Sequence, residues 1–417
     1  MINSKSAMSI DLTNRNYSTT EKVLILCARL PLPLNTGAKI RAFHVIKSIC
    51  SQYDTTLLFF YANHEEEVLF DDIAKLGIRL IPVFNPKIDR EIGVSDLLSN
   101  SFNSDPVTVA KYWHPEMAKI IKTESKVHNS IHCEHLHMAQ YLSEDIQTKT
   151  VLDAHNVEWL LAQRCFQTEN NIAKKCVLWW HYRKLKQYEA LSFGRFDMVF
   201  AVSDLDRLEI ERMGARGQVV TIENGVDIEY FQPKETVENG SLVFVGSMDW
   251  MPNDDGMHYF IDEIFPLLVA RGLNPQVFIV GRTPSSALRK KADKIKVVTI
   301  SGTVDDVRPY IEKCSVYIVP LRFGGGTRLK ILEAFAMKKA VVSTSLGCEG
   351  IECSNGEHLI IADSPESFAD SVELLLGDAD KRRLLAENAY HLIAEKYSWS
   401  VIADKIISSC RALFHNL

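Results

Sequence analysis

Short apolar runs alternate with longer amphipathic stretches along most of the chain. The runs are rich in β-branched and aromatic residues, as strands are, and the stretches between them carry apolar residues at helical spacing. Continuous apolar strands separated by helices are typical of parallel sheets buried on both faces. We expect strands in the first half at Val23–Cys27, Thr55–Tyr61, Ile78–Phe84, Val151–Asp153 and Met198–Val202, and in the second half at Leu242–Gly246, Gln276–Gly281, Lys296–Ile300, Val316–Pro320, Ala340–Thr344 and His358–Ile361.

Two such series in one chain predict an α/β protein with two doubly wound, Rossmann-like domains. The boundary falls between Glu223 and Ser241, where the sequence NGVDIEYFQPKETVENG combines turn residues, a proline and a charged run. The last segment has apolar residues at helical spacing, and it either caps the second domain or packs back on the first. The expected parts are a flexible tail at 1–20, an N-terminal domain at 21–222, a C-terminal domain at 223–396 and a C-terminal helix at 397–417.

The composition is that of a folded protein of ordinary charge. The chain has 417 residues, of which 46% are hydrophobic and 24% charged, and its net charge of −6 lacks the basic balance of a nucleic-acid-binding protein. Its nine cysteines include no C-x-x-C pair, which argues against a zinc site or a disulfide framework and favours a reducing compartment. The N-terminus lacks the apolar core of a secretion signal, and no apolar run is long enough to cross a bilayer. We therefore expect a cytoplasmic protein.

A glycine-rich loop follows the predicted strand at Val316–Pro320. Glycines let the backbone approach a ligand closely, and free N–H groups at the start of the following helix attract anions. In open α/β sheets, ligands bind beyond the carboxyl ends of the strands, where this loop is expected. The sequence therefore favours a phosphate site over a glycine-rich turn without a ligand. The residues concerned are Gly324, Gly325, Gly326 and Thr327.

Charged side chains follow this loop on the predicted helix. Arg328 and Lys330 can add charge-assisted hydrogen bonds to a phosphate. Glu333 lies within the next two turns, where a carboxylate can accept both hydroxyls of a ribose while the phosphates sit at the helix start. The alternative for Glu333 is a solvated side chain. The order of strand, glycine run, arginine, lysine and glutamate favours the ligand-binding interpretation.

This segment resembles the donor-binding motif of the family-4 retaining glycosyltransferases of GT-B fold, also described as glycosyl transferases group 1. The family usually shows E-x7-E, with glycines after the first glutamate and E-A-x-A at the second. The sequence E-A-F-A from Glu333 matches the second half, and Gly326 matches the glycine, whereas Gly325 stands in place of the first glutamate. The resemblance implies two Rossmann-like domains that face a cleft, with Glu333 on the donor ribose.

Other segments agree with this family in order and spacing. Asn224–Asp227 reads N-G-V-D, as at the start of the family's donor domain, and Leu242–Gly246 is similar to the first strand of that domain. The family's arginine and lysine after this strand, which hold the diphosphate, are absent, and the chain reads S-M-D-W-M-P-N there. Some branches of the family share this pattern and the later G-G-G-T-R. The resemblance then implies that Arg328, Lys330 and Arg322 take over the phosphate charge.

The resemblance also implies where the rest of the donor lies. The dipeptide Gly281-Arg282 ends another strand near the nucleobase, and Thr303-Val304 lines the base as well. A UDP-sugar is the commonest donor in the family, GDP-sugars are also used, and neither a metal nor another cofactor is essential. The expected donor-binding residues are Gly37, Gly246, Ser247, Asn253, Gly281, Arg282, Val304, Arg322, Gly324, Gly325, Gly326, Thr327, Arg328, Leu329 and Glu333, and the expected catalytic residues are His155, Arg328 and Lys330.

The N-terminal domain opens with a long loop and a predicted helix. Gly37 begins this helix, and in the family the glycine lets the donor phosphates and the acceptor come close; a simple helix start is the alternative. Arg41 and His44 on the same helix are expected at the surface. His155 follows the strand Val151–Asp153, where a family histidine faces the donor sugar. We expect it to hydrogen-bond a sugar hydroxyl or to stabilise oxocarbenium charge through its backbone carbonyl, although a lone histidine is usually structural.

A second polar cluster, formed by Glu134, His135 and His137, follows a short strand. The H-x-H spacing alone suggests a metal, but no third ligand lies at a sensible spacing. We therefore expect these residues to bind the acceptor or to have a structural role, and we expect no metal site.

An aromatic and basic stretch is predicted to be helical. It contains Trp179, Trp180, Tyr182, Arg183, Lys184, Lys186 and Tyr188. We expect the aromatic residues to form a stripe that faces the core, with a solvated basic edge. The alternative is a face that lies on an anionic membrane, with the protein peripheral at its inner face.

The expected reaction moves a sugar from a nucleoside-diphosphate donor to a hydroxyl of a sugar, lipid-linked or protein acceptor, in polysaccharide, lipid-linked glycan or glycoconjugate synthesis. Catalysis then depends on stabilising the negative charge of the leaving diphosphate. The alternatives are a UDP-sugar 2-epimerase of the same fold and a non-catalytic nucleotide-sugar-binding subunit. The missing glutamate and cations motivate the second alternative, whereas Glu333, the glycine run and His155 argue against it.

Overall fold

The computed structural model describes residues 21–90, 92–100, 105–143, 146–169, 171–234, 239–325 and 328–415. The expected tail at 1–20 and the loop residues Gly326 and Thr327 lie outside these ranges. The described residues form two compact units. One unit comprises residues 224–401, and the other comprises the residues up to Glu223 together with those from Ile402 onward.

The N-terminal unit is built on a parallel sheet with the strand order β3-β2-β1-β4-β5-β6-β7. In its register, Val23 of β1 lies between Thr55 of β2 and Ser130 of β4. The last strand was not expected, because it is only four residues long and partly exposed. The strands are β1 (Lys22–Cys27), β2 (Asp54–Tyr61), β3 (Arg79–Phe84), β4 (Ser130–Glu134), β5 (Lys149–Ala154), β6 (Met198–Ala201) and β7 (Gln218–Thr221).

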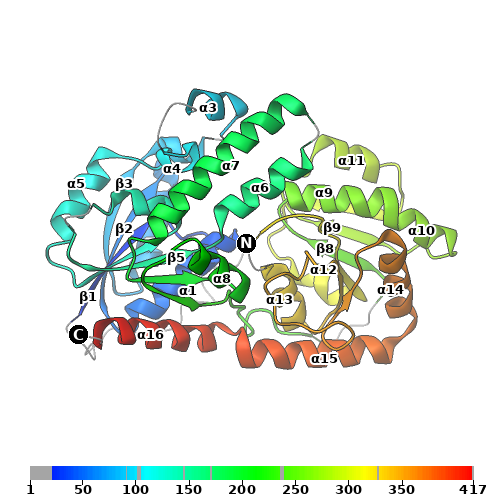
Figure 1. Ribbon diagram of the computed structural model, residues 1–417. Helices are drawn as coiled ribbons and strands as arrows, with labels where there is room; N and C mark the ends of the chain where they lie inside the picture. Colours follow the sequence, from blue (N-terminus) through cyan, green and yellow to red (C-terminus); the bar gives the residue numbers. More distant parts are fainter. Residues whose placement is uncertain are drawn as a thin grey trace. The chain divides into compact units, whose positions relative to one another are not determined.

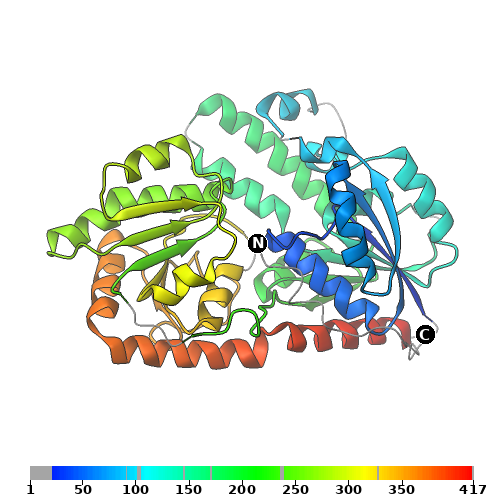
Figure 2. The same ribbon diagram turned by 180° about the vertical axis from the view of Figure 1, so that it is seen from behind.

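Helices cover both faces of this sheet: Figure 1 shows α7 in front of it, and Figure 2, from behind, shows α1. The first long helix begins where the sequence predicts, because the Thr36 side chain caps it by accepting from the backbone N–H of Lys39. The helices of this unit are α1 (Gly37–Cys50), η1 (His64–Leu69), α2 (Phe70–Ala74), η2 (Pro86–Asp89), α3 (Val94–Ser99), α4 (Val107–Ala110), α5 (Pro115–Glu124), η4 (Leu136–Tyr141), α6 (Glu158–Thr168), α7 (Ile172–Phe193) and α8 (Asp204–Arg212).

The C-terminal unit contains a second parallel sheet with the order β10-β9-β8-β11-β12-β13. Its central strands are apolar throughout and buried on both faces, which explains why the sequence predicted them within one or two residues. The strands are β8 (Leu242–Val245), β9 (Val277–Val280), β10 (Val298–Gly302), β11 (Val316–Val319), β12 (Ala340–Ser343) and β13 (Ile360–Ile361). The helices are α9 (Met251–Tyr259), η5 (Phe260–Ile264), α10 (Phe265–Ala270), α11 (Ser286–Ala292), α12 (Arg308–Lys313), α13 (Leu329–Ala336), α14 (Pro365–Gly377) and α15 (Ala379–Lys396).

The last helix, α16 (Trp399–His415), begins in the C-terminal unit and ends in the N-terminal unit. Its Lys405 ammonium lies 2.8 Å from both carboxylate oxygens of Glu223. The Phe414 ring packs 5.3 Å from the ring of Tyr53. The end of the chain thus completes the unit that the beginning of the chain forms.

The order of the strands determines where each unit can bind a ligand. In both sheets the first strand lies centrally, and the chain winds outward from it in two directions. Ligands of doubly wound sheets bind outside the carboxyl ends of the strands where this reversal occurs. The reversal falls between β1 and β4 in the N-terminal unit and between β8 and β11 in the C-terminal unit.

The exposed face of α7 differs from the sequence prediction. Trp179 and Trp180 are 40% and 46% exposed, so the expectation that they face the core is wrong. The helix instead buries the opposite side, through Leu185, Ser192 and Phe193. Aromatic residues on two neighbouring positions cannot show from the sequence alone which side of a helix meets the sheet.

Candidate functional site

The C-terminal cluster lies at the carboxyl ends of β8 and β11. Lys330, in the first turn of α13, reaches the first turn of α9, where its ammonium donates to Asn253 Oδ1 at 2.6 Å. The same ammonium lies 4.1 Å from the centroid of the Phe244 ring. Asn253 is buried and donates through Nδ2 to the Ser247 carbonyl at 2.7 Å. A neutral amide therefore positions the lysine, and no carboxylate is needed for this contact.

Gly246 leaves the space that this arrangement needs. A Cβ atom at Gly246 would lie 2.7 Å from Lys330 Nζ and 2.8 Å from Asn253 Nδ2, closer than real Cβ contacts. Gly281, after β9, approaches the loop after β8 so closely that a Cβ there would meet the Gly246 carbonyl oxygen at 1.8 Å. The predicted residues Gly246, Ser247, Asn253, Gly281 and Lys330 are thus brought together, with Arg282 beside them through its carbonyl, which accepts from Met248 N at 2.9 Å.

The pKa values of Lys330 and Glu333 are both shifted toward 7. Burial, assisted by the positive charge of Arg328, lowers the pKa of Lys330 to about 7, although Glu333 opposes this. Burial raises the pKa of Glu333 to about 7, although the Lys330 ammonium opposes this. One turn of α13 therefore holds a cation and an acid that both change charge near neutral pH. An anionic ligand at this place would favour the charged form of the lysine.

Arg328 is buried at the start of α13, and backbone carbonyls orient it. Its guanidinium donates to the carbonyl of Gly325 and, at 3.4 Å, to that of Leu346. Gly324 has φ +138°, and a Cβ there would lie 2.8 Å from Arg328 Nη2. A glycine at 324 is therefore required both by the backbone conformation and by the close arginine.

Other expected donor-binding residues occupy different surroundings. The Arg322 guanidinium pairs with the Asp255 carboxylate at 2.6 and 3.0 Å and lies 4.8 Å above the Tyr259 ring, so its charge has a carboxylate partner within the protein. The side chain of Arg282 donates to Asp249 Oδ2 at 3.2 Å. Leu329 and Val304 are partly buried and pack on the core of the unit.

The N-terminal cluster lies at the carboxyl ends of β4 and β5. Arg41 of α1 binds the Asp153 carboxylate through Nε and Nη2 at 2.6–3.0 Å and donates through Nη1 to the Glu223 carbonyl at 3.1 Å. Arg41 is 1% exposed and His44 is also buried, so the expectation that both lie at the surface is wrong. Arg41 points inward because the buried Asp153 carboxylate at the end of β5 requires a cation.

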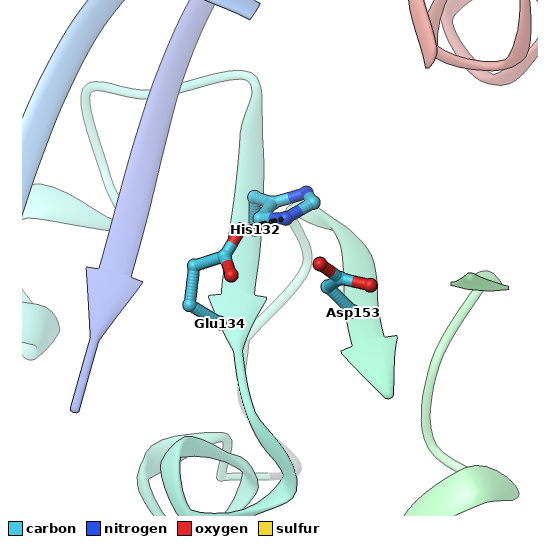
Figure 3. A group of neighbouring side chains, drawn as sticks. All are labelled: His132, Glu134 and Asp153. Carbon is cyan, nitrogen blue, oxygen red and sulfur yellow. Dashed lines mark hydrogen bonds and ion pairs between the residues drawn. The ribbon is translucent and has the colours of Figure 1, made fainter. Parts of the chain in front are cut away.

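Glu134 connects two histidines in this cluster. Its carboxylate accepts from His132 Nε2 and from His155 Nε2, both at 3.0 Å, and His155 Nε2 also lies 3.3 Å from Asp153 Oδ2. Against the effect of burial, Asp153 and Glu134 raise the pKa of His155. Figure 3 shows His132 and Glu134 on one strand pointing toward Asp153 on the next.

Ligand atoms of His132, Glu134 and Asp153 all lie within 4.8 Å of one another, a spacing that would suit a metal ion. The carboxylates, however, already have cationic or hydrogen-bonding partners in Arg41 and His155. Arg41 and His155 thus compensate the charge of these carboxylates within the unit, and the absence of a metal site stays a prediction.

His135 and His137 lie beside this network. His135 adopts φ +75°, and its ring centroid lies 3.7 Å from that of His155 and 5.9 Å from that of His137. Burial, together with the nearby His155, holds the pKa of His135 well below its usual value and lowers that of His137 to about 4. Both rings are therefore neutral at physiological pH, and they offer hydrogen bonds without charge. Gly37, at the start of α1, lies four residues before Arg41 on the same helix.

Sequence reasoning missed Arg41, Asp153 and His132 as members of the cluster. The one available signal was an arginine within the apolar sequence I-R-A-F of the first helix, which is unusual for a solvated side chain. Its partner Asp153 is 112 positions away in the sequence.

Comparisons with known proteins agree with this architecture. Residues 239–378 match the family "Glycosyl transferases group 1". A 44.6 kDa protein of the cps region of Klebsiella pneumoniae is 23% identical over 93% of this chain and 98% of its own length. The phosphatidyl-myo-inositol mannosyltransferase of Mycolicibacterium smegmatis is 28% identical over 54% of this chain and 58% of its own. In the described ranges, no helix combines the length and apolar character that a bilayer span requires.

A solved structure extends the likeness to the whole fold. The Anabaena protein HepE, determined in complex with UDP, superimposes with a TM-score of 0.67 at 14% identity, covering 94% of this chain and all of that one. The chain thus has the GT-B fold of two Rossmann-like units, and its residues 239–378 carry the signature of the glycosyl transferases group 1.

Proposed function

We propose that the protein is a retaining glycosyltransferase that uses a nucleoside-diphosphate sugar, a UDP-sugar in the first instance, in glycan synthesis. The observation that carries the proposal is the C-terminal cluster, in which Lys330 contacts the Asn253 amide and Arg328 contacts backbone carbonyls at a glycine-rich edge of the sheet. This edge lies within the segment that matches the glycosyltransferase family. A diphosphate placed there can accept charge-assisted hydrogen bonds from both cations.

The proposed reaction replaces the bond from the sugar to the diphosphate with a bond to the acceptor. The bond between the anomeric carbon and the diphosphate breaks, the acceptor oxygen bonds to the same face of the sugar, and the acceptor proton passes to the leaving phosphate. Lys330, Arg328 and the start of α13 stabilise the leaving diphosphate, and Glu333 accepts the ribose hydroxyls. Neither a metal nor another cofactor is part of the proposal, because side-chain cations perform the charge stabilisation.

The N-terminal cluster is suited to neutral hydroxyls. Its charges are compensated internally, so a hydroxyl can exchange hydrogen bonds with it without leaving a charge unpaired. We propose that His155, His135 and His137 bind sugar hydroxyls of the reactants, and that the buried Glu134 carboxylate orients the His155 ring. A mannosyltransferase among the relatives supports a hexose as the transferred sugar.

Calorimetric titration with a panel of nucleoside diphosphates and their sugars tests the proposal. We expect tight binding of one nucleoside type, and the Glu333→Ala variant should lose about 1.5–3 kcal/mol, the contribution of hydrogen bonds to a charged group. The matched control is Glu395→Ala, which removes an exposed glutamate from α15 of the same unit. Equal affinities of wild type and Glu333→Ala would contradict the assignment of Glu333.

A further inference from the structure

The exposed side of α7 carries tryptophans and cations together. Ile172, Trp179, Trp180 and Leu191 are 80%, 40%, 46% and 61% exposed, an unusual concentration of large apolar groups on one helix. At 100° per residue, nine of the ten exposed residues of α7 fall within a sector of about 140°, and the tenth, Lys174, lies outside it. We call this sector the α7 face, and it comprises Ile172, Ala173, Cys176, Trp179, Trp180, Arg183, Lys186, Gln187 and Leu191.

The charges of the α7 face are of one sign. Arg183 lies 5.1 Å above the Trp179 ring, and Lys186 lies 3.8 Å above the Trp159 ring of α6. The one carboxylate of α7, Glu189, is buried on the other side, where it accepts from the backbone N–H groups of Glu158 and Trp159 at 2.9 and 2.7 Å. No acid of α7 therefore offsets the cations at its surface.

We propose that the α7 face docks on the surface of an anionic phospholipid membrane. Tryptophan prefers the boundary between lipid headgroups and acyl chains, and arginine and lysine at the same depth bind headgroup phosphates. On the α7 face, cations lie between the exposed apolar side chains, so tryptophan and arginine can reach the headgroup region from the same side of the helix. Figure 1 shows the position of α7 on the N-terminal unit. The inference is independent of the proposed reaction, since it needs no nucleotide.

Co-sedimentation of the whole chain with vesicles tests this surface. We expect binding to phosphatidylglycerol vesicles, little binding to phosphatidylcholine vesicles, and weaker binding at high salt. The double variant Trp179→Ala/Trp180→Ala and the double variant Arg183→Glu/Lys186→Glu should each bind at least about tenfold more weakly, because each apolar or cationic contact contributes several-fold. Trp113→Ala is the matched control, since it removes a 56% exposed tryptophan of the same unit outside α7, and it should bind as the wild type does.

Three results would overturn the proposal. They are equal binding to both kinds of vesicle, no binding at all, and unchanged binding of both double variants. A wild-type dimer that Trp179→Ala/Trp180→Ala dissociates would identify a second copy of the chain as the occupant instead. Circular dichroism and nucleotide titration of the same variants separate loss of this surface from loss of folding or of the donor site.

Discussion

The two polar clusters of this protein differ in the partners that surround their charged side chains. In the N-terminal cluster, Arg41 faces Asp153 and His155 faces Glu134, so each buried charge has its counter-charge within the unit. In the C-terminal cluster, Lys330 and Arg328 meet an amide and backbone carbonyls. The first arrangement is complete without a ligand, whereas the second gains most from an anion. The difference suggests that buried charge serves the fold in one unit and the ligand in the other.

The largest effect is expected on the free energy of unfolding, for a substitution in the N-terminal cluster, where the buried charges compensate one another. Arg41→Met leaves the Asp153 carboxylate buried without its strongest partner, and we expect it to lower the free energy of unfolding by about 3–5 kcal/mol. Urea denaturation followed by circular dichroism measures this change. Arg79→Met is the control, because the Arg79–Glu124 pair is largely exposed on the arginine side and contributes at most about 1 kcal/mol. A loss for Arg41→Met no larger than for the control would remove the basis of the comparison.

The next effect is expected on turnover. Lys330→Ala removes a cation that stabilises the leaving diphosphate, and we expect kcat/KM to fall by about 10²–10³-fold, while the free energy of unfolding falls by no more than about 1–3 kcal/mol, because the buried Asn253 amide loses one hydrogen bond. Donor-hydrolysis or transfer assays with radiolabelled sugar nucleotide provide the measurement. Lys290→Ala, which removes an exposed lysine of α11, should retain full activity. Turnover by Lys330→Ala within about twofold of wild type would show that the cation is structural.

The smallest effect is a pH dependence. Because the pKa of Lys330 is about 7 in the free protein and an anion raises it, donor binding takes up a proton above pH 7. Through Lys330, affinity should therefore fall by up to about tenfold per pH unit above pH 7, and it should also fall below pH 7, where protonated Glu333 no longer accepts the ribose hydroxyls as a carboxylate. Measuring the donor affinity of Lys330→Arg at several pH values sharpens the test. Arginine stays charged, so the affinity of this variant should not show the decrease above pH 7 that Lys330 causes. Parallel pH profiles for the two proteins would mean that Lys330 is charged before the ligand arrives.

The sequence predicted the two sheets well and the side-chain environment poorly, for a physical reason. Strands such as β8 and β11 are buried on both faces, so their composition alone identifies them. Helix faces depend on which side meets the sheet, and this is decided by partners far along the chain. Arg41 and Trp179 were therefore placed on the wrong side of their helices.

The glycine-rich edge of the C-terminal sheet was predicted less well than the strands and better than the helix faces. A glycine run followed by arginine, lysine and glutamate predicted a phosphate-binding edge, and the structure places Lys330 and Asn253 together at that edge. The ion pair of Arg322 with Asp255 was not predicted, because the two residues are separated by 67 positions. Motifs that are local in sequence were thus informative, and pairs that are distant in sequence were not.

The passage of α16 into the N-terminal unit has a consequence for biosynthesis. Because Lys405 and Phe414 contact Glu223 and Tyr53, the unit that leaves the ribosome first lacks part of its own packing until the final residues are translated. The C-terminal unit ends at Val401. Removing residues 402–415 would therefore weaken the N-terminal unit, whose other residues all precede position 224, rather than the unit next to the cut.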